Sequence, residues 1–136
     1  MVNLPEEVMK EFNDPKSMKV IATKTASGNV HAIRVGSLMA PAPNMMAVGA
    51  ILMKETSKNI DEMKKKNELV SLLVSVDMKS YQVRAKVKDF QTAGPLFDKM
   101  NEELKKIGLA ARGVYTFEPV EVYNQSASYE AGKRMV

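Results

Sequence analysis

The sequence has no cysteine and no tryptophan, and only one of its 136 residues is a histidine. The missing thiols exclude disulfides, thiolate metal sites, iron–sulfur clusters and cysteine nucleophiles. A histidine metal site or a Ser–His–Asp triad would depend on His31 alone, which we expect to be a polar residue at a strand edge. We therefore predict no metal site, and the sequence leaves any catalytic residue unknown.

Long apolar runs are also absent. No segment approaches the roughly 18 apolar residues that a membrane span requires, and residues 1–7 lack the basic-then-apolar order of a signal peptide. Together with the lack of cysteine, these features predict a cytoplasmic protein that does not enter membranes.

The charge bias is small. A formal net charge of +4 permits nucleic-acid binding, but the lysines are spread along the chain and aromatic residues make up only 6% of it. Proteins that bind single-stranded nucleic acid interleave aromatic and basic side chains, and this sequence does not. We therefore do not expect a nucleic-acid partner, and the mild basicity favours a small anionic ligand.

Strand-like alternation dominates the sequence. We expect a single domain over residues 1–136, with an N-terminal helix within residues 1–15 and a polar tail at residues 124–136. The expected strands cover residues 18–25, 30–39, 45–53, 69–76, 80–90 and 109–123, the last of them kinked at Pro119. Two further helices are expected, one from the polar junction after residue 53 to about residue 67 and one from Gly94-Pro95 to Gly108. About six antiparallel strands with two or three helices indicate a mainly β protein, an antiparallel barrel with helices over its openings.

The most informative segment is Lys54-Glu55-Thr56-Ser57-Lys58-Asn59, which lies between an apolar strand and a predicted helix. The first N–H groups of a helix have no internal partner and carry partial positive charge. With two lysines and two hydroxyls nearby, this junction has the chemistry of a phosphate-binding site. The alternative is that Thr56 or Ser57 only caps the helix and that the lysines are solvated.

Three segments together resemble the flavin mononucleotide (FMN)-binding split-barrel superfamily, which includes pyridoxamine 5′-phosphate oxidase, small flavin-binding proteins and deazaflavin-dependent reductases. They are residues 30–37, residues 53–60, and residues 83–99 with the turn Phe90-Gln91-Thr92-Ala93-Gly94-Pro95. Their order and spacing carry the resemblance, which covers roughly residues 18–123. It implies an antiparallel split β-barrel.

The resemblance also implies a site. The flavin phosphate would lie against Lys54, Thr56, Ser57 and Lys58. The isoalloxazine ring would be bordered by Arg34, Val35, Gly36 and Ser37, with Leu52 and Met53 close to it. Members form two-fold dimers with the cofactor at the interface, so a homodimer is expected, and the tail residues Tyr123, Gln125, Ser126 and Tyr129 are candidates to reach the partner's flavin.

The implied function is that of an FMN-binding flavoprotein, a small oxidoreductase or electron-transfer protein. The sequence has no Walker loop and no dinucleotide fingerprint, so any redox chemistry would belong to the bound cofactor. It is much shorter than a typical vitamin-processing oxidase and lacks an arginine–histidine cluster near its C-terminus, which argues against the oxidase reaction. Two alternatives remain. One is a reductase that binds the deazaflavin coenzyme, and the other is a non-catalytic binding module that has lost cofactor affinity or uses its basic face for nucleic acid.

Overall fold

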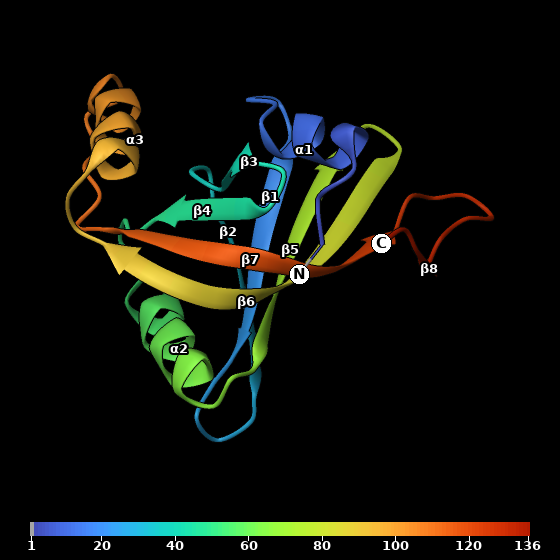
Figure 1. Ribbon diagram of the computed structural model, residues 1–136, viewed down its shortest axis with the longest axis horizontal. Helices are drawn as coiled ribbons and strands as arrows, with labels where there is room; N and C mark the ends of the chain where they lie inside the picture. The colour runs from blue at the N-terminus through green and yellow to red at the C-terminus, as the bar shows by residue number, and fades with distance from the viewer. Residues whose placement is uncertain (1) are drawn as a thin grey trace.

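The computed structural model describes residues 2–136, which form three α-helices and one eight-stranded antiparallel sheet (Figure 1). The helices are α1 (Glu6–Phe12), α2 (Lys54–Lys65) and α3 (Pro95–Lys105). The strands are β1 (Met18–Lys24), β2 (Val30–Arg34), β3 (Met39–Ala42), β4 (Met45–Gly49), β5 (Leu69–Val76), β6 (Lys79–Gln91), β7 (Val114–Asn124) and β8 (Lys133–Arg134). The predicted fold class, mainly antiparallel β with helices, is confirmed.

The sheet runs in the order β2-β1-β5-β6-β7-β4-β3, and β8 pairs with the end of β7. The long strand β6 joins the two halves of the sheet, because it pairs with β5 on one side and with β7 on the other. Its ladder with β7 changes register twice, near Ala85 and near Asp89. Such bulges bend a strand and increase its twist. As a result β4, β7 and the end of β6 cross β1 and β5 steeply, and the sheet coils into a barrel (Figure 1).

The core follows from the alternation of side chains along the strands. Tyr81, Val83, Ala85 and Val87 of β6 are buried, as the sequence pattern predicts. The same alternation buries Ile21 in β1 and three residues of β5, which are Val70, Leu72 and Val74. These side chains converge inside the barrel and form one continuous apolar cluster.

Helices α1 and α2 cover the barrel. Val8 and Phe12 of α1 and Ile60 of α2 have no exposed surface, and Met63 of α2 is 4% exposed. Full burial of one such side chain contributes about 1.5–3 kcal/mol, so packing rather than capping holds these helices in place. Within residues 2–136 no helix has the length and apolar character needed to cross a membrane.

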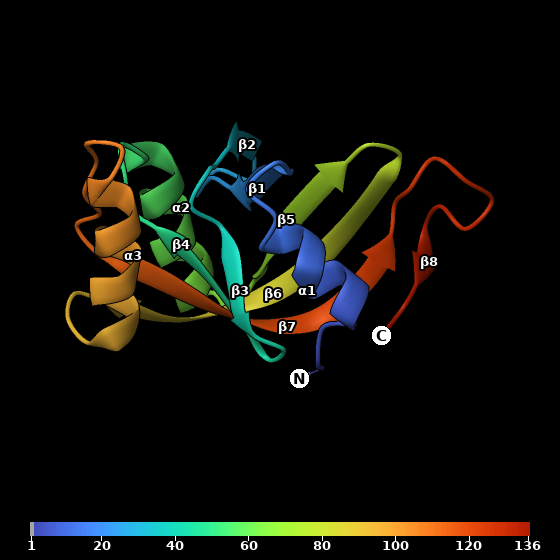
Figure 2. The same cartoon turned by 90° about the horizontal axis from the view of Figure 1, so that it is seen from above.

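Helix α3 lies apart from α1 and α2, beside β4 and the start of β7 (Figure 2). Its Met100 and Leu104 pack against Ala47, Ala111 and Val114 in a second, smaller cluster. The apolar residues of this segment are only partly covered, because Leu96 and Phe97 are half-buried and Ile107, just beyond α3, is 69% exposed.

The structure corrects several predicted boundaries. The expected strand over residues 30–39 is divided into β2 and the start of β3, because the chain leaves the edge of β1 after Val35. The expected strand over residues 45–53 ends at Gly49. β3 extends to Ala42, beyond the expected end at residue 39, and includes Pro41. This is possible because β3 is an edge strand with few ladder bonds to lose. The polar tail adds a further strand, β8.

Candidate functional site

The connection between β2 and β3 builds one wall of the candidate site. Val35 donates its N–H to the carbonyl oxygen of Lys19 in β1 at 3.0 Å. Two residues later, the Ser37 hydroxyl accepts the N–H of Gly49 in β4 at 3.0 Å and donates to the Gly49 carbonyl oxygen at 3.3 Å. Residues 35–38 therefore link β1, near one end of the strand order, to β4, near the other end.

A cavity of about 440 Å³ lies against this connection, and we call it the ring cavity. Six of its lining residues were predicted from the sequence, and they are Arg34, Val35, Gly36, Ser37, Leu52 and Met53. Gly49 also lines it. Its other lining residues are Ile33, Ile51, Leu104, Ile107 and Leu109. The lining is mainly apolar with Arg34 and Ser37 as polar groups, which is the usual composition of a cofactor pocket.

A second cavity of about 390 Å³ adjoins the ring cavity and shares Ile51, Leu52, Met53 and Leu109 with it. We call it the helix cavity, because it lies at the beginning of α2. Two cationic side chains line it, those of Lys54 and Arg112.

The first turn of α2 supplies free donors at this point. Met53 is the N-cap residue and makes no side-chain capping bond, and Ser57 is the first residue to donate back to it, to the Met53 carbonyl oxygen at 2.9 Å. The three preceding N–H groups, those of residues 54–56, therefore have no partner within the helix. An uncapped helix N-terminus beside two cations is suited to bind an anion.

The structure divides the predicted phosphate-binding junction into two faces. The helix begins at Lys54 as predicted, and neither Thr56 nor Ser57 caps it. Lys54 and Lys58 are exposed, whereas Thr56 and Ser57 are only 1% and 4% exposed and their hydroxyl oxygens are buried without a hydrogen-bond partner. Lys54 and Lys58 are four residues apart and share the exposed face of α2. Thr56, two residues from each of them, points to the other side, and the burial of Ser57 places its side chain at the edge of that inner face. The four side chains therefore do not converge on one point.

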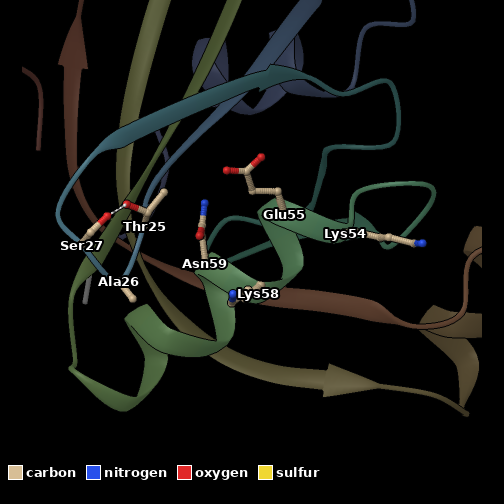
Figure 3. A pocket seen from close by; sticks show the side chains of 7 residues that line it. All are labelled: Thr25, Ala26, Ser27, Lys54, Glu55, Lys58 and Asn59. Atoms are coloured by element: carbon tan, nitrogen blue, oxygen red, sulfur yellow. Dashed lines mark hydrogen bonds between the residues drawn. The ribbon is translucent and has the colours of Figure 1, made fainter.

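Lys54 and Lys58 also line a third cavity, of about 560 Å³, which we call the hairpin cavity because the β1–β2 turn forms its other wall. Figure 3 shows the side chains of Glu55 and Asn59 on the same side of α2, while Lys54 extends away from Thr25 and Ser27. Lys54 thus stands between the helix cavity and the hairpin cavity.

Arg112 lines the helix cavity and was not predicted from the sequence. Its guanidinium lies 4.9 Å from the centre of the Phe90 ring, and Phe90 packs against Tyr115 with ring centres 4.5 Å apart. The Tyr115 hydroxyl donates to Asp61 of α2 at 3.2 Å. Burial raises the pKa of Tyr115, so its hydroxyl stays neutral and keeps this bond. A single arginine in the loop after a predicted helix gave no sequence signal for this role.

The sequence matches no known family model and no curated protein. Solved structures do match the fold. HupZ of Group A Streptococcus superposes with a TM-score of 0.77 at 14% identity, covering 95% of this chain and 99% of that one. An FMN-binding protein of Syntrophomonas wolfei gives a TM-score of 0.72 at 12% identity, with 90% and 88% covered. An F420 reductase gives 0.65 at 16% identity, with 88% and 98% covered.

The chain has the split-barrel fold. The fold that the sequence resemblance implied is thereby confirmed. The fold is shared although the sequences are only 12–16% identical. In this split barrel the ring and helix cavities lie where the β2–β3 connection, the end of β4 and the start of α2 meet.

Proposed function

We propose that this split barrel binds FMN, with the isoalloxazine ring in the ring cavity and the phosphate in the helix cavity. One observation supports the proposal most strongly: the apolar ring cavity lies next to an uncapped helix N-terminus that has two cationic side chains beside it. FMN has the same division, because a flat and largely apolar ring system is joined through a ribityl chain to a phosphate. Bound FMN would supply the redox chemistry of a small oxidoreductase or electron-transfer protein.

The residues fit the cofactor by size and charge. The two cavities, about 440 and 390 Å³, are within the range of roughly 300–1,000 Å³ typical of ligand pockets. Lys54 and Arg112 would neutralise the phosphate, and the N–H groups of residues 54–56 would donate to its oxygens. Lys58 would add attraction from one helical turn further on.

In this proposal the side chains of Thr56 and Ser57 do not bind the phosphate, although the sequence predicted that they would. Thr56 would contribute its backbone N–H, because its hydroxyl is buried on the opposite side of α2. The Ser57 N–H is already bonded to Met53, so Ser57 would support the helix rather than bind the phosphate.

We also propose that a second copy of the chain completes the site. Leu52, Ile107 and Leu109 line the cavities and are 96%, 69% and 40% exposed. Apolar side chains gathered around a ligand pocket are typical of a surface that another protein covers. A homodimer would cover these three residues and shield the ring from water.

The deazaflavin coenzyme F420 is the second candidate. An F420 reductase has the same fold, and Lys54 lines both the helix cavity and the hairpin cavity. This additional space would hold a tail longer than that of FMN.

The test is a spectroscopic titration of protein purified without denaturation. The proposal expects flavin absorption in the visible spectrum of the protein as isolated, or after FMN is added and the excess removed, at one FMN per chain. F420 should compete only weakly. Tighter binding of F420 would favour the second candidate, and binding of neither would identify a barrel that has lost its cofactor.

A further inference from the structure

A fourth cavity, of about 410 Å³, lies between α1 and the turn that joins β5 to β6. It shares no lining residue with the ring, helix or hairpin cavities. Figure 1 shows α1 beside this turn, on the opposite side of the barrel from α2. Its charged lining residues are Glu7, Lys10, Glu11, Asp14, Asp77 and Lys79.

Glu11 is the residue that points to a ligand. It lies on the face of α1 that packs into the core with Val8 and Phe12, and it is only 7% exposed. Its Oε2 atom is buried and has no hydrogen-bond partner. A carboxylate removed from water in this way is costly unless a cation or a donor compensates it.

The charges around Glu11 do not cancel. Among residues 2–136, none of the eight ion pairs includes any of the six charged residues of this cavity. The Asp14 carboxylate accepts the N–H of Lys16 at 2.8 Å, which is a local turn contact. Four carboxylates facing two ammonium groups leave an excess of two negative charges, in a chain whose net charge is +4.

The three other carboxylates act on Glu11. Burial is the main cause of the raised pKa of Glu11, Lys79 opposes it, and Asp14, Asp77 and Glu7 raise it further. The pKa of Tyr81, which also lines the cavity, is raised by burial and then by Glu7 and Glu11. The acidic groups are therefore close enough to attract one cationic ligand together.

We propose that this cavity binds a small organic dication, an alkane diamine. A metal ion does not fit, because no three acidic or histidine side chains in the described part of the chain converge closely enough to hold one. Two ammonium groups match the two uncompensated charges. The apolar surfaces of Val76, Met78 and Tyr81 line the same cavity and would contact the methylene chain between the ammonium groups.

Isothermal titration calorimetry with putrescine and cadaverine, two alkane diamines, at fixed ionic strength tests this proposal. We expect saturable binding of one ligand per chain, and much weaker binding of Mg²⁺. Binding should weaken about tenfold in Glu11→Gln and in Asp77→Asn, since each removes one attractive charge. Glu103→Gln is the matched control, because Glu103 lies on the exposed side of α3 and its loss should leave the affinity unchanged.

The Asp77 variant keeps the test decisive if Glu11→Gln alters folding, because Asp77 is exposed in the turn and asparagine also tolerates its φ of 52°. Equal binding of Mg²⁺ and the diamines would show a diffuse ion atmosphere and overturn the proposal. Equal affinities in the Asp77→Asn and Glu103→Gln variants, or no saturable binding at all, would overturn it as well. None of these outcomes depends on whether FMN binds.

Discussion

The Ser37 hydroxyl bonds to both backbone groups of Gly49, as acceptor from the N–H at 3.0 Å and as donor to the carbonyl oxygen at 3.3 Å. This pair fixes the β2–β3 connection against the end of β4 and so shapes the ring cavity. Gly49 itself has little spare room, because an added Cβ would lie 3.4 Å from Ala111, Met100 and Ser37. This wall of the ring cavity therefore depends on the contact between the small side chain of Ser37 and the backbone of Gly49, which has no side chain.

Replacing Ser37 by alanine should remove both bonds. We expect a loss of about 1–2 kcal/mol in the free energy of unfolding, since the backbone groups of Gly49 lose a partner in a partly buried place. FMN affinity should fall as well, because the connection becomes looser. Urea unfolding and an FMN titration measure the two effects. Unchanged values of both would show that the hydroxyl does not hold this wall.

Gly113→Ala should disturb the support of Arg112. A Cβ at Gly113 would lie 2.1 Å from Cζ of Phe90, the ring over which Arg112 lies. Overpacking of this kind costs roughly 1–3 kcal/mol, and the displaced ring should move Arg112 and weaken FMN binding. Gly36→Ala is the control for stability, because a Cβ there meets nothing within 4 Å. Equal stability of the two variants would contradict this packing.

Glu11 should make stability depend on pH. Its pKa is raised in the folded chain, chiefly by burial, so the folded state holds the proton more tightly than the unfolded state. The free energy of unfolding therefore falls as pH rises from the ordinary glutamate pKa through the raised folded value. Glu11→Gln removes this loss, so it should gain stability relative to the wild type as the pH rises through the raised pKa of Glu11, as thermal unfolding would show. A stability difference that does not change with pH would contradict the burial of this carboxyl group.

Thr56→Val tests the inward orientation of the Thr56 side chain. The buried hydroxyl has no partner, so a methyl group of similar shape should leave stability unchanged or raise it by up to about 1 kcal/mol. FMN affinity should change little, because only the N–H of Thr56 is proposed to meet the phosphate. A large loss of affinity without a loss of stability would show that the hydroxyl binds the cofactor.

Local patterns predicted most of the fold. The strand over residues 69–76 coincides with β5, and the alternation in β6 predicted its buried face. The kink expected at Pro119 is confirmed by the register shift next to its partner Ala85. The division of residues 30–39 was not predictable in this way. It depends on Ser37 bonding to Gly49, a contact between segments that sequence periodicity cannot relate.

The candidate site was predictable only where local sequence patterns determine it. The start of α2 at Lys54 follows from the switch between strand and helix periodicity. The prediction that Lys54, Thr56, Ser57 and Lys58 all contact the phosphate did not include the rotation of about 100° per residue along a helix. This rotation turns Thr56 and Ser57 inward. Arg112 joins Lys54 only because α3 and the loop after it return beside β4, and no local pattern encodes this approach.

The comparison of FMN with riboflavin, which lacks the phosphate, tests the central claim most directly. Fluorescence titration should show that Lys54→Ala/Lys58→Ala binds FMN about tenfold or more weakly than the wild type, while riboflavin affinity stays within about twofold. The control is Lys64→Ala/Lys65→Ala, which removes the same charge from the other end of α2 and should preserve the affinity for FMN. Equal losses for both ligands, or equal losses in both double variants, would contradict a phosphate site at the start of α2.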